Sequence, residues 1–132
     1  MQKVEFFGIG RDPVYSQAVR IGNRVEISGQ GGWDVDTNFP EKLEDEIGQA
    51  FKNVAAVLNQ AGTSWDNVIS VNSYHVGLAG HQDEMNTIMG RNFKKYMPEH
   101  KPIWTNNGVT ALGDPKMRVE IRVVAIRVVA ID

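Results

Sequence analysis

The sequence contains no cysteine and no long apolar run. Without cysteine the chain has no disulfide, no thiolate nucleophile and no zinc site with cysteine ligands. Nowhere does an apolar stretch approach the roughly 20 residues that a membrane-spanning helix needs. The first residues, MQKVEFFGIGRD, lack the apolar core and small-residue cleavage site of a signal peptide. We therefore expect a cytoplasmic protein with no membrane partner.

A basic excess and a metal-ligand pattern are also missing. Lysine and arginine total 14 against 16 acidic residues, a net charge of −2, so no nucleic-acid partner is expected. The three histidines, His75, His81 and His100, do not have the spacing of metal ligands, so no metal site is predicted. The 132 residues are 42% hydrophobic and 23% charged, which fits one globular domain over residues 1–132.

Apolar periodicity predicts six strands and two helices. Alternating or β-branched segments predict strands, and apolar residues at spacings of three and four predict helices. The predicted strands are residues 3–9, 24–28, 67–78, 103–111 and 117–126, together with a second strand that is entered from a loop within residues 13–20 and ends at a turn at Gly22-Asn23. The predicted helices are 42–61 and 81–97. This βββαβαββ order indicates an α+β fold, a mixed β-sheet with two helices on one face.

Two helices cover only one face of such a sheet, whereas the strands carry apolar residues on more than that face. We therefore expect the other face to meet a partner subunit. The sequence RVVAI occurs at residues 122–126 and again at 127–131. The repeat is interpreted as a strand extension or a duplication at a tolerant terminus rather than as a functional tail.

Two polar features are candidates for a site. In residues 117–126, alternation predicts Arg118, Glu120 and Arg122 on one strand face. A carboxylate between two arginines forms either a solvated ion-pair ladder or the floor of a polar site. The glycine-rich residues 29–32 form either a β-bulge or a backbone N–H cradle for a ligand. The residues alone leave both choices open.

Taken together, the segments resemble the RidA/YjgF family, also called endoribonuclease L-PSP. The matching segments are Tyr15-Ser16-Gln17-Ala18-Val19, Val25-Glu26-Ile27-Ser28-Gly29-Gln30, Gln49-Ala50-Phe51-Lys52-Asn53-Val54, Gly62, Asn86, Pro102 and Val119-Glu120-Ile121. The likeness covers nearly the whole chain in order. It implies a chorismate-mutase-like fold and a homotrimer with three clefts between subunits, each binding a small-molecule metabolite.

The resemblance also implies a chemistry. Family members of the deaminase type hydrolyse 2-enamines and 2-imines to 2-oxo acids and ammonia, without metal or cofactor. An arginine in a Pro-Ala-Arg-Ser stretch binds the substrate carboxylate through two charge-assisted hydrogen bonds. Here the stretch is Pro102-Ile103-Trp104-Thr105, so Trp104 stands in the arginine position. An indole offers only an apolar face and one N–H donor, which predicts weaker binding of acidic substrates.

By position, the resemblance places nine residues in the cleft. Glu120 is the expected catalytic group, and the expected ligand-binding residues are Tyr15, Gly29, Gln30, Gly31, Asn86, Trp104, Thr105 and Asn106. The leading interpretation is a trimer that binds an altered, neutral or aromatic substrate and performs enamine or imine chemistry through Glu120.

Other interpretations remain open. The first is a 2-iminobutanoate/2-iminopropanoate-type deaminase in which Arg118 or Arg122 replaces the lost charge. The second is a non-catalytic ligand-binding or chaperone-like trimer in which Trp104 fills the cleft. The acidic charge balance argues against the ribonuclease activity that the family label names.

Overall fold

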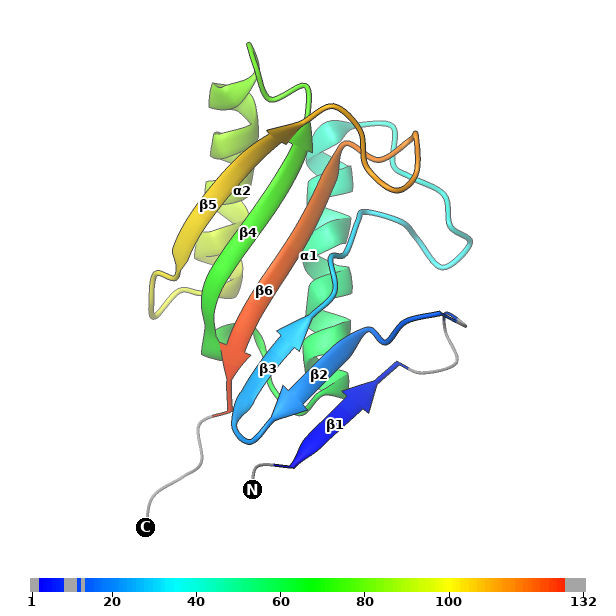
Figure 1. Ribbon diagram of the computed structural model, residues 1–132. Coiled ribbons are helices and arrows are strands. Elements are labelled where there is room, and N and C mark those ends of the chain that lie inside the picture. Colours follow the sequence, from blue (N-terminus) through cyan, green and yellow to red (C-terminus); the bar gives the residue numbers. More distant parts are fainter. Residues whose placement is uncertain (1–2, 9–11, 13, 128–132) are drawn as a thin grey trace.

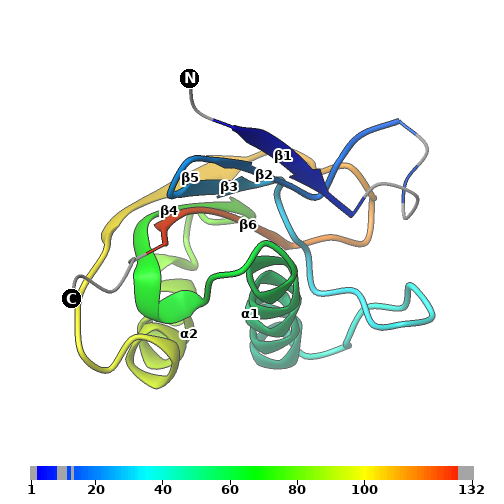
Figure 2. The ribbon, with the colours of Figure 1, turned by 90° about the horizontal axis from the view of Figure 1, so that it is seen from below.

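Two helices pack on one face of a six-stranded mixed sheet in the computed structural model, which describes residues 3–8, 12 and 14–127 (Figure 1; Figure 2). The strands are β1 (Val4–Phe7), β2 (Ala18–Ile21), β3 (Arg24–Ile27), β4 (Val68–Val76), β5 (Ile103–Val109) and β6 (Val119–Ile126). The helices are α1 (Leu43–Gln60), α2 (Gln82–Tyr96) and the short 3₁₀ helix η1 (Trp65–Asn67). The predicted α+β class and the βββαβαββ order are confirmed.

The strand order in the sheet is β1-β2-β3-β6-β4-β5. All neighbouring strands are antiparallel except β4 and β5, which are parallel. The β2–β3 hairpin turns at Gly22, whose φ of 60° lies in the left-handed region that glycine adopts without strain. The C-terminal strand β6 therefore lies between β3 and β4, and β5 forms one edge of the sheet.

The core lies between the sheet and the helices. The apolar stripe of α1 includes Ile47, Phe51, Val54 and Leu58, all fully buried, as its spacing predicts. Three acidic residues occupy the first turn of α1, where the helix dipole favours them. The ring of Phe51 stacks on that of Trp65 with 4.9 Å between centroids. This packing holds α1 against the centre of the sheet.

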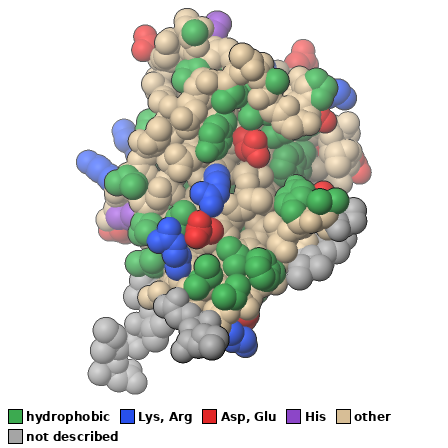
Figure 3. All heavy atoms as spheres, viewed as in Figure 1, with side chains coloured by type: hydrophobic (Ala, Val, Ile, Leu, Met, Phe, Trp, Pro, Cys, Tyr) green, Lys and Arg blue, Asp and Glu red, His purple; other side chains and the backbone are tan. Residues whose placement is uncertain are grey.

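The sheet face opposite the helices, called the open face below, is uncovered in a single chain (Figure 2). Its exposed apolar side chains include Val4, Phe6 and Ile103, the last 74% exposed. Figure 3 shows this face, with apolar side chains gathered over one end of it and charged side chains nearer its middle. An apolar, uncovered face agrees with the expectation that a partner covers it.

None of the described helices is both long and apolar enough to cross a membrane. The second RVVAI segment falls outside the described residues apart from Arg127, so its interpretation stays a prediction.

Candidate functional site

Glu120 lies on β6 and points to the open face. Its neighbours Val119 and Ile121 are fully buried in the core on the helix side, so strand alternation turns Glu120 the other way. Its carboxylate forms no hydrogen bond or ion pair with any residue that the structure describes. Burial raises the pKa of Glu120 above its ordinary value. A carboxyl group with a raised pKa transfers protons more readily near neutral pH.

Gly29, just beyond β3, allows the backbone to lie against this carboxylate. A Cβ at Gly29 would overlap the Glu120 side chain, so any larger residue there would displace the carboxylate from its present position. The next residue holds the segment in place, because Gln30 and Ile121 exchange backbone hydrogen bonds of 2.9 Å in both directions. The buried amide of Gln30 donates to Gln17 Oε1 at 2.9 Å. Gln30 is expected to bind ligand, but it does not line the cavity beside Glu120; instead its backbone pairing with Ile121 holds Gly29 in position.

A cavity of about 520 Å³ opens beside Glu120 and Gly29. Tyr15, which is 51% exposed, forms part of its wall. The remaining lining residues are Asp12, Gln17, Trp33, Thr37, Phe39, Gly113, Asp114 and Met117. Sequence reasoning missed most of them, because segments 33–39 and 113–117 carried only turn signals. Every charged residue in this described lining is acidic, so this wall offers a substrate carboxylate no cation.

The prediction that Glu120 lies between two arginines is wrong. The Nε of Arg118 donates to Glu46 Oε1 at 2.7 Å, and its backbone N–H donates to Glu46 Oε2 at 2.7 Å. Arg118 therefore turns toward α1, because regular β6 pairing begins only one residue later. Arg122 does share the open face with Glu120, but its Nη2 donates to Glu26 Oε1 at 2.9 Å. Both guanidinium groups are already engaged by other carboxylates.

Trp104 on β5 points to the helix side of the sheet. Its indole N–H donates to Ser73 Oγ at 2.9 Å, and its ring meets that of Phe93 edge to face, with 5.0 Å between centroids. It lines a separate hollow of about 490 Å³ at the end of α2. Because β4 separates β5 from β6 and the two side chains lie on opposite faces, Trp104 does not reach the Glu120 cavity of its own chain.

Asn86 and Asn106 lie near Trp104 rather than near Glu120. The Nδ2 of Asn106 donates to Asn86 Oδ1 at 2.7 Å, which joins β5 to α2. Thr105 alternates to the open face and is exposed. These residues and Trp104 form a second group at the edge of the sheet, called the β5–α2 edge below.

Gly31 lines neither hollow. A Cβ there would overlap Met117 and the ring of Trp33, and its carbonyl oxygen accepts a hydrogen bond of 2.8 Å from Asn53 Nδ2. Within one chain, the nine expected site residues thus divide into three sets. Tyr15, Gly29 and Glu120 share the cavity, Asn86, Trp104, Thr105 and Asn106 lie at the β5–α2 edge, and Gln30 and Gly31 pack behind the cavity.

His75 belongs to a buried polar chain behind the β5–α2 edge. Its Nε2 lies 2.8 Å from Ser73 Oγ, which also accepts the Trp104 indole N–H. The side chain is fully buried, and burial lowers the pKa of His75 to about 4, so the imidazole is neutral. In the described part of the chain, no three histidine, cysteine or acidic residues are grouped so that they could hold a metal ion.

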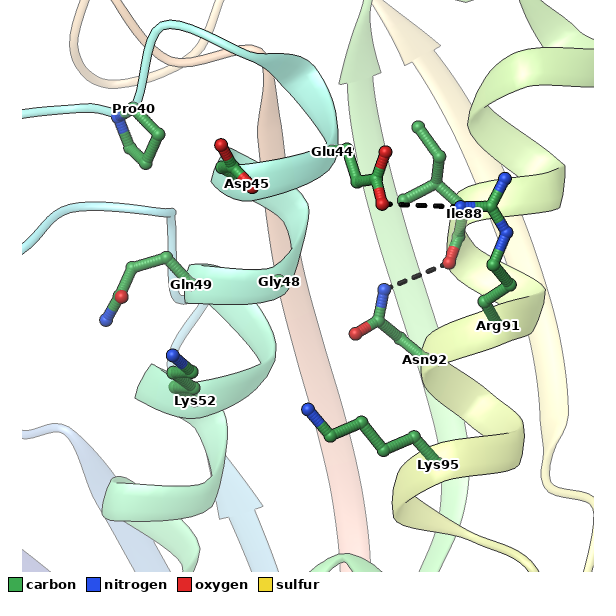
Figure 4. A pocket seen from close by; sticks show the side chains of 10 residues that line it. All are labelled: Pro40, Glu44, Asp45, Gly48, Gln49, Lys52, Ile88, Arg91, Asn92 and Lys95. Carbon is green, nitrogen blue, oxygen red and sulfur yellow. Dashed lines mark hydrogen bonds and ion pairs between the residues drawn. The ribbon is translucent and has the colours of Figure 1, made fainter.

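A third hollow, of about 460 Å³, lies between α1 and α2 (Figure 4). None of the expected site residues lines it. An ion pair of 3.4 Å between Arg91 and Glu44 spans one end, and Asn92 Nδ2 donates to the backbone oxygen of Ile88 at 3.0 Å (Figure 4). This groove lies in the helix layer, on the opposite side of the sheet from Glu120.

Comparisons with known proteins agree on one family. The family model described as Endoribonuclease L-PSP matches residues 11–127. A RutC family protein of Aquifex aeolicus is 34% identical over 114 residues, which cover 86% of this chain and 88% of that protein. The human protein named 2-iminobutanoate/2-iminopropanoate deaminase is 33% identical over 116 residues, 86% of this chain and 80% of its own length.

A solved structure is similar over almost the full length. The crystal structure of yeast Mmf1 superposes with a TM-score of 0.82 at 25% identity, covering 95% of this chain and 99% of the yeast chain.

Proposed function

Because the chain belongs to the endoribonuclease L-PSP family, also known as RidA/YjgF, we propose that it hydrolyses an enamine or imine of a small metabolite, with Glu120 as the acid–base group. One observation carries the proposal. The half-buried carboxylate of Glu120 lines an open cavity beside Gly29 and Tyr15, and it has no ion-pair partner among the described residues. The name of the human relative, an imine deaminase, supports the same class of reaction.

In the proposed reaction, water attacks the electrophilic carbon of a protonated imine. The water oxygen forms the new C–O bond while the C=N π electrons move to nitrogen, and Glu120 accepts a proton from the water. Glu120 then returns that proton to the nitrogen. The C–N bond breaks as a lone pair of the hydroxyl oxygen forms the C=O bond, and the hydroxyl proton passes through Glu120 to the departing ammonia. A carbonyl compound and an ammonium ion leave. Positioned proton transfer of this kind contributes about 10²- to 10⁴-fold in rate.

We propose a homotrimer as the working assembly. Glu120 points to the open face, whereas Trp104, Asn106 and Asn86 of the β5–α2 edge lie on the helix side, so these groups form a single cleft only when different copies contribute them. The exposed apolar residues of the open face, and Ile103 at the sheet edge, support such contacts. In this arrangement Trp104 of one copy borders the Glu120 cavity of the next.

We propose a neutral or aromatic substrate rather than a 2-imino acid. According to the family resemblance, the indole of Trp104 stands where a carboxylate-binding guanidinium is expected, and the charged groups in the described cavity lining are all acidic. Arg118 and Arg122, the candidate replacements, are held by Glu46 and Glu26. The non-catalytic alternative, in which Trp104 fills the cleft between subunits, is a separate hypothesis: Trp104 lies outside the Glu120 cavity of its own chain and would have to fill that of the next copy.

A pair of coupled assays tests this proposal. An amine oxidase generates an imine that has no carboxylate group, called the uncharged imine below, and an amino-acid oxidase generates a 2-imino acid. Semicarbazide traps the imine that remains unhydrolysed. The protein should suppress semicarbazone formation strongly with the uncharged imine and weakly with the 2-imino acid. Equal suppression would contradict the proposed substrate class, and no suppression with either imine would contradict the proposed activity.

A further inference from the structure

Gln17, on the wall of the Glu120 cavity, has one side-chain atom that the described protein does not use. The residue lines the cavity and is only 4% exposed. Its Oε1 accepts a hydrogen bond of 2.9 Å from Gln30 Nε2. Its Nε2 forms no hydrogen bond with any residue that the structure describes, yet surrounding atoms do not enclose it completely. The N–H donors of this nitrogen are therefore available to a molecule in the cavity.

The neighbours of Gln17 fix the direction in which its amide points. Gln30 Nε2 donates to two acceptors, Gln17 Oε1 and, at 3.2 Å, the backbone oxygen of Ser28. If the Gln30 amide were turned over, its oxygen would face the Ser28 carbonyl oxygen, and two acceptors would meet without a proton between them. Gln30 therefore keeps its nitrogen toward Gln17, although its own Oε1 is buried without a partner among the described residues. Gln17 has to meet that nitrogen with Oε1, which leaves its Nε2 free.

Packing also confines the rest of the Gln17 side chain. A Cβ added at Gly8 would overlap Gln17 Cβ and Cγ, so the backbone at Gly8 lies directly against this side chain. The backbone of Gln17 is held on both sides, because its N–H donates to the Phe7 oxygen and its carbonyl oxygen accepts from the Ser28 N–H, both at 2.8 Å. A donor that is already held in place loses little conformational entropy when a ligand binds to it.

We propose that Gln17 Nε2 donates a hydrogen bond to a neutral carbonyl oxygen of the substrate, and that the preferred substrates are imines that carry a carboxamide group. The carboxamide narrows the neutral substrate class of the proposed function, on which this inference rests. The charged residues in the described cavity lining, Asp12, Asp114 and Glu120, are all acidic and repel a carboxylate. A carboxamide has the same shape and offers a carbonyl acceptor without the charge. An alkyl group of similar size would leave the Gln17 donor unpaired.

Direct binding of stable carbonyl compounds tests this inference without relying on catalysis. An NMR titration compares three compounds of similar size. Pyruvamide is the product expected from a 2-imino amide, pyruvate has a carboxylate in place of the amide, and butanone lacks the second carbonyl group. Pyruvamide should bind roughly 2- to 12-fold more tightly than butanone, the range that one neutral hydrogen bond supplies. It should also bind more tightly than pyruvate.

Gln17→Glu removes the donor with little other change, since a glutamate oxygen still accepts the hydrogen bond from Gln30. The preference for pyruvamide over butanone should disappear in this variant. Gln60→Glu makes the same chemical change at the exposed end of α1 and should keep the wild-type preference. If Gln17→Glu does not fold, Gln30→Met takes its place. It removes the group that orients the Gln17 amide, so the preference should fall while butanone binds as before.

The outcomes separate this inference from the proposed function. Equal binding of pyruvamide and butanone by a wild-type protein that hydrolyses an uncharged imine would overturn the inference and leave the proposed function standing. A wild-type preference for pyruvamide that persists in Gln17→Glu would also overturn it, because a purely structural role of Gln17 predicts that result. A preference for pyruvamide that depends on Gln17, in a protein that releases no ammonia from any imine, would support the donor and contradict the proposed activity.

Discussion

Arg118 and Glu46, 72 residues apart in the chain, tie the start of β6 to the first turns of α1. The guanidinium Nε and the backbone N–H of Arg118 occupy one oxygen each of the Glu46 carboxylate, both at 2.7 Å. The Glu46 side chain is fully buried. Arg118 Nη2 also donates to the backbone oxygens of Pro40 and Glu41, at 3.1 and 2.9 Å. The pair thus fixes the loop that precedes α1 as well as the strand that carries Glu120.

Arg118→Ala should therefore destabilise the fold strongly. It leaves the buried Glu46 carboxylate without its cation, which typically costs about 3–5 kcal/mol in the free energy of unfolding. Urea denaturation measures the change. Arg91→Ala is the control, because its ion pair with Glu44 is exposed on both sides and should change stability by less than about 1 kcal/mol. Equal small effects in the two variants would contradict the structural role of Arg118.

Gly29→Ala should reduce catalysis without unfolding the protein. The added Cβ overlaps the Glu120 carboxylate, so that side chain must move away from its place in the cavity. We expect imine hydrolysis to fall by at least about tenfold, while the far-ultraviolet circular dichroism stays unchanged. Gly48→Ala is the control, since a Cβ at Gly48 contacts nothing within 4 Å and alanine favours the helix by about 1 kcal/mol. Wild-type activity in Gly29→Ala would contradict a catalytic role for the close contact between Gly29 and the Glu120 carboxylate.

Local periodicity predicts the helices and strands of this chain, but it does not predict which site residues lie together. The predicted helix 42–61 is α1 at Leu43–Gln60, because its apolar stripe and terminal signals are local. The direction of Arg118 was predicted wrongly, because its partner Glu46 is distant in sequence and alternation applies only once strand pairing begins. Alternation places Trp104 and Thr105 on opposite faces, but it does not tell which face the helices cover. The cavity walls from segments 33–39 and 113–117 depend on loop paths that no periodicity encodes.

His75 makes stability depend on pH in the acidic range. Its folded pKa of about 4 lies below the ordinary value of 6.5, so between these values the unfolded chain binds a proton that the folded chain does not. The free energy of unfolding should fall as pH drops from 6.5 to 4, with about 3 kcal/mol of that loss due to His75.

His75→Gln should flatten this part of the pH profile, measured by urea denaturation at a series of pH values. His81→Gln removes an exposed histidine and should keep the wild-type slope. If the two variants gave the same pH profile, His75 would not be the buried neutral group described above.

Trp104→Arg should supply a guanidinium group that binds the carboxylate of acidic substrates. A charge-assisted hydrogen bond contributes roughly 1.5–3 kcal/mol, so kcat/KM for a 2-imino acid should rise roughly 10- to 150-fold relative to that for an uncharged imine. Gln60→Arg adds the same charge at the exposed end of α1, away from both groups of site residues, and should leave this ratio unchanged. Some loss of stability is expected, since the bond to Ser73 Oγ is removed. An unchanged ratio in Trp104→Arg would contradict the assignment of this position to substrate selection.

The most direct measurement compares wild-type protein with Glu120→Gln in ammonia release from an uncharged imine produced by an amine oxidase. The substitution keeps the size of the side chain and removes its ability to accept a proton. We predict that the rate falls by about 10²-fold or more, with the thermal midpoint and the sedimentation behaviour unchanged. A Glu120→Gln variant that hydrolyses the imine at the wild-type rate would contradict the proposed role of this carboxylate.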